Sequence, residues 1–217
     1  MSRPVAIILA AGKGTRMASD LPKVLHPMLG EPLVAFPIRA ARDAGAGTVV
    51  VVVGYEGERV QAEVDARFPG AGGWLRYATQ AEQLGTGHAV MCALPELPKA
   101  DDAPQGVALV LSGDVPLLRA QTLQALHEAC RASTAGLALA TFRPDDPAGY
   151  GRILRDDAGR VLGIREHRDA SEAERAVGEC NAGTYAIDLL HLRADLPSLG
   201  RSNAQGEIYL TDLVALA

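Results

Sequence analysis

Apolar runs and amphipathic stretches alternate along the first two thirds of the chain. The apolar or largely apolar runs that predict strands are residues 5–10, 49–53, 74–78, 107–111 and 137–142. Runs that are apolar at almost every position are typical of strands buried on both faces. Helical spacing lies between them, near residues 34–44, 57–66, 87–94 and 121–131. This alternation predicts an α/β, doubly wound fold, with a mostly parallel sheet covered by helices on both faces.

The pattern changes after Phe142. Residues 151–155 and 160–166 are short alternating segments joined by Asp156-Asp157-Ala158-Gly159, which predicts a β-hairpin. We therefore interpret residues 144–179 as a small β-rich insertion beside the main sheet. Residues 184–190 again have the residue pattern of an apolar strand or of a strand leading into a helix.

Composition narrows the class of protein. With 217 residues, 48% of them hydrophobic and 22% charged, the chain resembles one globular domain with room for an insertion. A net charge of −5 argues against nucleic acid as a partner, because a nucleic-acid binder needs a basic face. The apolar run near the N-terminus is too short to span a membrane. The three cysteines are far apart without a CxxC pair, which favours reduced thiols and a cytoplasmic location.

A small-residue loop follows the first predicted strand and carries the densest chemical signal. It reads Leu9-Ala10-Ala11-Gly12-Lys13-Gly14-Thr15-Arg16-Met17, and Lys23 follows shortly after it. Small residues let the backbone approach a ligand, and successive N–H groups can bind an anion. Arg16 and Lys23 would add positive charge. The Walker and GxGxxG patterns do not match, so the alternative is a tight turn with solvated cations.

Two further loops contain candidate ligands. Asp114 follows the strand at residues 107–111, where a carboxylate can bind Mg²⁺ together with phosphate oxygens or can cap the next helix. Gln80 begins a glycine-bearing loop at residues 80–88, and its amide can recognise a base edge. An ordinary loop with a helix beginning at Thr86 is the alternative. No histidine has metal-ligand spacing and no GxSxG motif occurs, so covalent nucleophilic catalysis has no support.

These blocks together resemble a known family. The chain is similar to the N-terminal uridylyltransferase region of bacterial bifunctional N-acetylglucosamine-1-phosphate uridylyltransferase / glucosamine-1-phosphate acetyltransferase. The matching blocks are residues 9–23, 80–88, 113–117, 149–153 and 203–207. The resemblance implies a Rossmann-like domain that transfers UMP from UTP to N-acetylglucosamine 1-phosphate, an early step of cell-wall precursor synthesis.

The resemblance also implies a role for individual residues. Arg16, Lys23 and Asp114 would be catalytic, and Asp114 would bind Mg²⁺ as the cofactor's ligand. An Asn beyond Ala217 would share that metal. Substrate would be bound by a set that runs from the first loop to the sugar side: Leu9, Ala10, Ala11, Gly12, Lys23, Gln80, Gly85, Thr86, Ser112, Gly113, Asp114, Gly151, Glu166 and Asn181.

Two expectations concern the rest of the protein and the rival functions. Members of this family continue into a left-handed β-helix with acetyltransferase activity. That region is absent here, so we expect a fragment that forms a homo-oligomer, a trimer, only with the missing domain. The rivals are another nucleotidyltransferase acting on a different sugar or alcohol phosphate, and a noncatalytic UDP-sugar-binding regulator.

Overall fold

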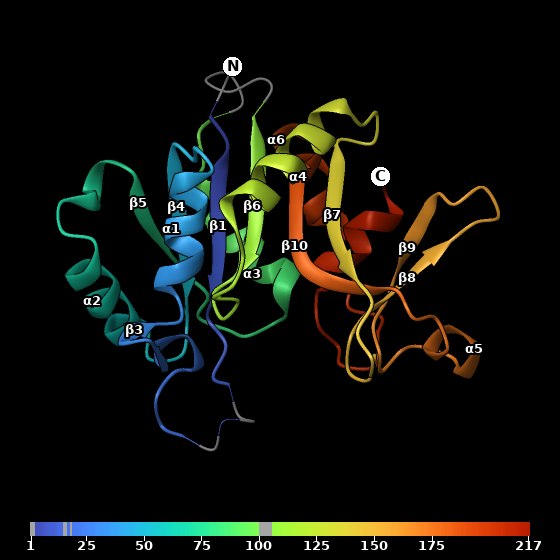
Figure 1. The fold of residues 1–217 in the computed structure, drawn as a ribbon, viewed down its shortest axis with the longest axis horizontal. Helices are drawn as coiled ribbons and strands as arrows, with labels where there is room; N and C mark the ends of the chain where they lie inside the picture. Colours follow the sequence, from blue (N-terminus) through green and yellow to red (C-terminus); the bar gives the residue numbers. More distant parts are fainter. Residues whose placement is uncertain (1–2, 15–16, 18, 100–105) are drawn as a thin grey trace.

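Four parallel strands form the centre of the protein. The computed structural model describes residues 3–14, 17, 19–99 and 106–217. The parallel strands are β1 (Val5–Ala10), β4 (Thr48–Val53), β5 (Leu75–Thr79) and β6 (Val107–Ser112). They lie in the order β5-β4-β1-β6, and their carboxyl ends point to the lower edge of Figure 1. The predicted strands at these positions are confirmed.

An antiparallel strand extends this sheet beyond β6. The strand β10 (Cys180–Asp188) pairs antiparallel with β6 on one side and with β7 (Leu137–Phe142) on the other. The strand β7 therefore runs in the same direction as β6 but is separated from it. The residues of β7 are mostly only half-buried, unlike those of β6, because β7 does not lie in the middle of the sheet. The eight-stranded sheet is therefore mixed: the central pairings of β1, β4, β5 and β6 are parallel, as predicted, whereas the pairings of β10 are antiparallel.

Helices cover both faces of the sheet. One face packs against α1 (Ala35–Asp43), α2 (Gly57–Arg67) and α4 (Ala120–Ala132). The other packs against α3 (Thr86–Ala93), α6 (Leu189–Asp195) and the 3-10 helix η6 (Leu210–Ala215). Neighbouring strand residues alternate between the two cores, so Ile8 belongs to the first and Ile7 to the second. The doubly wound prediction is confirmed.

The predicted β-hairpin is present at the side of the sheet. It consists of β8 (Arg152–Arg155) and β9 (Val161–Arg165), and the carboxylate of Asp156 accepts hydrogen bonds from two backbone N–H groups of its turn. Arg152 of β8 pairs with Cys180 of β10, which joins the hairpin to the main sheet. The short helix α5 (Glu172–Arg175) follows it with a capping box at Ser171.

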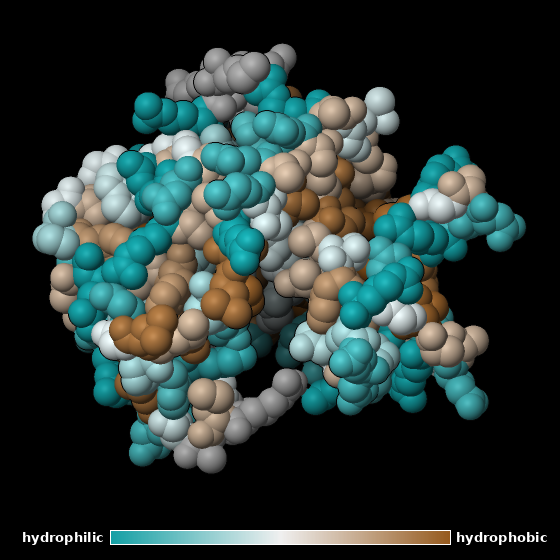
Figure 2. Space-filling model, viewed as in Figure 1, coloured by the Kyte–Doolittle hydropathy of each residue, from teal (hydrophilic) through white to brown (hydrophobic). Residues whose placement is uncertain are grey.

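Short elements complete the chain. They are β2 (Pro27–Met28), β3 (Glu31–Pro32) and the 3-10 helices η2 (Lys23–Leu25), η3 (Ala71–Gly73), η4 (Leu94–Glu96) and η5 (Leu196–Ser198). On the face seen in Figure 2, hydrophobic residues form separate small patches among hydrophilic ones. Within the described ranges, no helix has both the length and the apolarity needed to cross a bilayer. The three cysteines are free thiols.

Candidate active site

The ends of β1 and β6 place the first loop beside Asp114. Leu9 pairs with Ser112 in the sheet, and the N–H of Gly113 donates to the carbonyl oxygen of Leu9 at 2.9 Å. A Cβ atom on Gly113 would lie 2.9 Å from that same oxygen, closer than a side chain can approach. Gly113 is therefore needed for the close contact between the two strand ends, whatever it contributes to a ligand.

Lys23 and Asp114 form the charged centre of this edge. Their ammonium and carboxylate groups form an ion pair, and Lys23 is held in place by the buried Val24 and Leu25 that follow it in η2. Gly14, at φ +69°, packs against Lys23 so closely that a Cβ there would overlap the Lys23 side chain. The glycine thus lets the loop fold over Lys23.

Asp114 is an anion at neutral pH and does not cap the next helix. Burial of the carboxyl group opposes ionisation, but hydrogen bonds from Lys23 and from the Ser112 hydroxyl outweigh it and lower the pKa of Asp114. The N-cap of α4 is Arg119, five residues later. The helix-cap alternative for Asp114 is therefore wrong, and Ser112 acts on this carboxylate directly.

A pocket of about 520 Å³ opens around the ion pair. Its lining combines the first loop with the end of β6: Leu9, Gly12, Gly14, Met17, Lys23, Val24, Ser112 and Asp114. Arg16, the other predicted cation, lies outside the described residues. Lys13 belongs to the same loop, but its ammonium group lies 5.0 Å from the ring centroid of Tyr55. This cation–π contact occupies Lys13, so of these two lysines it is Lys23 that faces Asp114.

A second pocket, of about 240 Å³, adjoins the first on the α3 side of β1. The two pockets share Leu9 and Gly12, so they meet at the carboxyl end of β1. The second pocket brings together most of the residues predicted to bind the nucleotide, with three additional ones, and is lined by Leu9, Ala11, Gly12, Gln80, Gln83, Gly85, Thr86, Ala89 and Glu207. Ala10 is buried behind them.

The loop after β5 is held in shape by Gln80. Its side-chain Nε2 donates to the carbonyl oxygen of Gly85 at 3.0 Å and lies 3.1 Å from Nδ1 of His88. Gly85 has φ +107°, and a Cβ there would come within 3 Å of the backbone of Ile208. The helix α3 begins at Thr86, as predicted by the interpretation of residues 80–88 as an ordinary loop that leads into a helix. Thr86 nevertheless lines the second pocket.

Three pocket features were missed by the sequence analysis. Gln83 donates from Nε2 to the carbonyl oxygen of Ala11 at 2.9 Å, which ties the two loops together. Gly54, after β4, packs against Ala11 and Gln80 so closely that a Cβ would meet both. Glu207 reaches the pocket because the N–H of Ile208 donates to the carbonyl oxygen of Leu84. These contacts join distant segments, so no local pattern could have indicated them.

The predicted sugar-side residues lie together beside the hairpin. The backbone N–H of Asn181 donates to the carbonyl oxygen of Gly151 at 2.9 Å. A Cβ on Gly151 would lie 2.9 Å from the side chain of Ile164 and 3.3 Å from Oε1 of Glu166, so the glycine allows the carboxylate to approach its backbone. The hydroxyl of Thr211 donates to the same Oε1 at 3.1 Å. Gly151, Glu166 and Asn181 therefore lie together in one cluster.

Negative charge surrounds Glu166. Burial raises its pKa, the hydroxyl of Thr211 opposes this, and the charges of Asp169, Asp212 and Glu207 raise it further. Glu207 also lines the second pocket, so the sugar-side cluster and the nucleotide-side pocket share a neighbour. The charge pattern makes Glu166 a stronger hydrogen-bond partner for neutral hydroxyl groups than for another anion.

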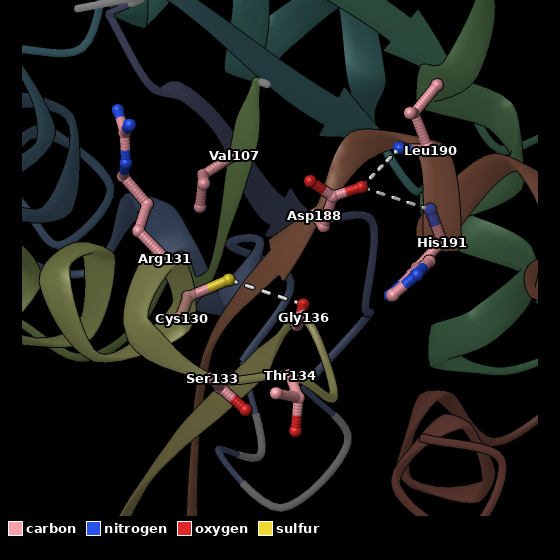
Figure 3. Close-up of a pocket in the computed structure, with 9 residues that line it drawn as sticks. All are labelled: Val107, Cys130, Arg131, Ser133, Thr134, Gly136, Asp188, Leu190 and His191. Carbon is pink, nitrogen blue, oxygen red and sulfur yellow. Dashed lines mark hydrogen bonds between the residues drawn. The ribbon is translucent and has the colours of Figure 1, made fainter. Parts of the chain in front are cut away.

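A third cavity, of about 380 Å³, lies at the opposite edge of the sheet (Figure 3). It differs from the two pockets described above in the role of its polar groups. Its polar groups serve local structure: Asp188 accepts from the N–H groups of Leu190 and His191, and the thiol of Cys130 donates to the carbonyl oxygen of Gly136. Arg131 points away from the other side chains in this view. The cavity lies at the start of β6, away from the loops where open α/β sheets bind ligands.

Asp114 is a fitting ligand for one divalent cation accompanied by phosphates. Among the residues that the structure describes, no group of three His, Cys, Asp or Glu side chains could hold a metal alone. Mg²⁺ is commonly anchored by one or two carboxylates and completes its coordination with water and substrate phosphates. A single ionised, half-buried carboxylate at the end of a strand suits that arrangement, because the adjoining pocket has room for phosphates.

Comparison with protein families identifies the domain. Residues 6–177 match the family model described as the MobA-like NTP transferase domain. The chain belongs to this family. It is a nucleotidyltransferase domain, and the crevice at the ends of β1 and β6 is its candidate active site.

Relatives and a solved structure agree with the family. The chain is 52% identical over 217 residues to the bifunctional protein GlmU of Pelobacter propionicus and 50% identical over 217 residues to that of Trichlorobacter lovleyi. Each of these matches includes 100% of this chain but only 45% of the relative's length. The resemblance inferred from the five blocks is confirmed. A crystal structure of UDP-glucose pyrophosphorylase complexed with UDP-glucose has the same fold, with a TM-score of 0.76, 17% identity and coverage of 99% of this chain and 86% of that one.

Proposed function

We propose that this domain transfers UMP from UTP to N-acetylglucosamine 1-phosphate with Mg²⁺ and releases pyrophosphate. One observation carries the proposal: the pocket around Lys23 and Asp114 shares Leu9 and Gly12 with the nucleotide-side pocket, and Glu207 of that second pocket is a charged neighbour of Glu166 in the sugar-side cluster. A transferase of this kind needs a base site, a phosphate and metal site, and a sugar site close to one another. The family and the GlmU relatives support the same reaction class.

The reaction would proceed by attack of a phosphate oxygen of the sugar phosphate on the α-phosphorus of UTP. The bond between the α-phosphorus and the bridging oxygen of pyrophosphate breaks as the new P–O bond forms. The nucleophile is already an anion, so no general base is required. Catalysis then depends on positioning and on stabilising negative charge.

Lys23 and the backbone of the first loop would supply much of that stabilisation. The ammonium group of Lys23 faces the pocket between the ends of β1 and β6, where the phosphates would lie. Asp114 would hold the Mg²⁺ ion, which would supply positive charge to offset that of the phosphates. Arg16 is proposed as a second phosphate contact on the resemblance alone.

The sugar-side cluster would orient the acceptor. Glu166 can accept hydrogen bonds from sugar hydroxyls, and Asn181 can both donate and accept. The absence of a Cβ on Gly151 lets Glu166 lie directly against the Gly151 backbone, so both can contribute to one site. Preference for the N-acetyl group over a plain hydroxyl is part of the proposal and rests on the similarity to GlmU.

The decisive experiment is pyrophosphate release from a panel of nucleotides and sugar phosphates. UTP with N-acetylglucosamine 1-phosphate should give the highest kcat/KM, and removal of Mg²⁺ by a chelator should abolish turnover. Equal or better turnover with glucose 1-phosphate would contradict the assignment of N-acetylglucosamine 1-phosphate as the acceptor. Binding of UDP-sugars without pyrophosphate release from any pair would favour the regulator instead.

The longer relatives raise two further proposals. The chain spans less than half of their length, so acetyl transfer by a left-handed β-helix region is proposed only for a longer protein. Assembly into a trimer through that region remains a prediction, as does a cytoplasmic location.

A further inference from the structure

A buried tyrosine hydroxyl lies behind the sugar-side cluster. Tyr185 belongs to β10, between β6 and β7, and only 4% of its surface is exposed. Its hydroxyl accepts a hydrogen bond from Nδ2 of Asn181 at 2.6 Å. The rest of the ring packs in the hydrophobic core on the α3 side of the sheet. A hydroxyl is costly to bury without a partner, so this contact needs an explanation beyond core filling, which phenylalanine would also achieve.

An irregularity in β10 brings the two side chains together. The pairing of β10 with β7 shifts register between Asn181 and Tyr185, and Gly183 lies in the left-handed region with φ +69°. The N–H of Gly183 donates to Oδ1 of Asn181 at 3.0 Å. A bulge of this kind re-aims a side chain next to a functional site. Here it directs the amide of Asn181 back toward the Tyr185 hydroxyl.

The contacts fix every part of Asn181. Its backbone N–H is held by Gly151, its Oδ1 accepts from Gly183, and its Nδ2 donates to Tyr185. These bonds also settle which amide atom is oxygen, because the N–H of Gly183 can only donate. One Nδ2 hydrogen and one Oδ1 lone pair remain for a ligand.

We propose that Tyr185 is a positioning residue, whose hydroxyl fixes the amide of Asn181 so that its free hydrogen and lone pair are presented to the sugar of the substrate. The inference rests on the proposed function, because it assumes that Asn181 binds the sugar. Tyr185 acts through Asn181 and does not itself contact the sugar. Burial, together with the charge of Glu166, raises the pKa of Tyr185 well above its ordinary value, so the hydroxyl stays neutral.

The test is Tyr185→Phe, measured by calorimetric binding of UDP and of UDP-N-acetylglucosamine. Loss of one positioning hydrogen bond corresponds to a loss of roughly 2- to 12-fold in affinity for UDP-N-acetylglucosamine. Affinity for UDP should not change, because the uridine and phosphate contacts lie elsewhere. In turnover, KM for the sugar phosphate should rise while KM for UTP stays constant.

Two variants control for nonspecific effects. Tyr77→Phe removes a comparable hydroxyl, whose bond to Asp65 at 2.6 Å lies on the far side of the sheet, and should change neither affinity. In an Asn181→Ala background, Tyr185→Phe should cause no further loss of sugar affinity, since the group that it positions is gone. An additive loss, or an equal loss for UDP, would overturn the proposal.

A measurement on the wild-type protein covers the case in which Tyr185→Phe does not fold. One side-chain amide hydrogen of Asn181 should exchange slowly with solvent in nuclear magnetic resonance spectra, because it is bonded to a buried hydroxyl. Fast exchange of both hydrogens would contradict the contact. If the wild-type protein binds UDP and UDP-N-acetylglucosamine equally and uses no sugar phosphate, the proposed function itself fails, which is a different outcome from an unaffected Tyr185→Phe.

Discussion

Lys23 and Asp114 form an ion pair across the junction between the first loop and the end of β6. A nucleotide with a bound cation would require both kinds of group: an ammonium for the phosphates and a carboxylate for the cation. Their pairing keeps both in the pocket and neutralises them mutually. In the proposed reaction, a nucleotide that arrives with its cation would contact both members of the pair, the phosphates at Lys23 and the cation at Asp114.

Replacement of Lys23 by alanine tests its role in charge stabilisation. We expect Lys23→Ala to lower kcat by roughly 10²- to 10³-fold, the usual cost of losing one contact that stabilises transition-state charge. Lys13→Ala is the matched control, because Lys13 belongs to the same loop but lies over Tyr55. It should change kcat by less than about threefold. Similar rates for the two variants, measured as pyrophosphate release, would contradict the assignment of Lys23.

Replacement of Asp114 by asparagine tests the cation site without changing side-chain size. Asp114→Asn should lower metal-dependent turnover by roughly 10²-fold or more, because the anionic ligand is lost. Its thermal unfolding should shift little, since the ion pair with half-exposed Lys23 contributes at most about 1 kcal/mol. Mn²⁺ binding in the presence of UTP, followed by electron paramagnetic resonance, gives a second readout. Asp157→Asn, at an exposed turn, is the control, and wild-type Mn²⁺ affinity in Asp114→Asn would reject the site.

Much of the fold follows from local sequence pattern, whereas strand order does not. The runs of apolar residues in β1, β4 and β6 mark buried strands because each is long enough and apolar on both faces. Nothing within residues 137–142 shows that β10 lies between β7 and β6. Pairing partners depend on packing among segments far apart in the chain, which periodicity does not report.

The same limit applies to the site. Strand ends and small loops predicted the crevice, because parallel strands deliver their carboxyl ends to one edge. The residues that position the predicted ligands could not be found in this way: Gln83 reaches Ala11, Thr211 reaches Glu166, and Tyr185 reaches Asn181 across a bulge. Each contact depends on the exact geometry of two separate segments.

Acid should weaken the attachment of the hairpin through Glu179. Hydrogen bonds from Arg155, at 2.9 Å and 2.8 Å, hold the pKa of Glu179 at about 2, below its ordinary value of 4.5. A lowered carboxylate pKa stabilises the folded state above pH 4.5, and this stabilisation is lost as pH falls from 4.5 toward 2. Glu179→Gln should lower the free energy of unfolding at neutral pH by about 1.5–3 kcal/mol.

The two proteins should therefore converge in acid. Denaturant unfolding at several pH values measures the difference between wild type and Glu179→Gln. The difference should be constant above pH 5 and should shrink steadily below 4.5. A gap that stays the same down to pH 3 would mean that charge on Glu179 contributes nothing to stability.

Gly12 and Gly113 should respond oppositely to the same substitution. A Cβ on Gly12 meets no heavy atom within 4 Å, although Gly12 lines both pockets, whereas a Cβ on Gly113 would lie 2.9 Å from the carbonyl oxygen of Leu9. Gly12→Ala should therefore keep or slightly raise stability, by up to about 1 kcal/mol, because the unfolded chain loses freedom. Gly113→Ala should lower stability by about 1–3 kcal/mol, because the strand ends must separate.

UTP binding gives a further test of the difference between Gly12 and Gly113. In Gly12→Ala the new methyl group occupies the place where the nucleotide would approach the backbone, so UTP affinity should fall at least tenfold while the melting temperature is maintained. Calorimetric titration with UTP and thermal unfolding of both variants measure the two effects. Unchanged UTP affinity in Gly12→Ala would remove the first loop from the nucleotide site, because this is the position at which a side chain would block the ligand without disturbing the fold.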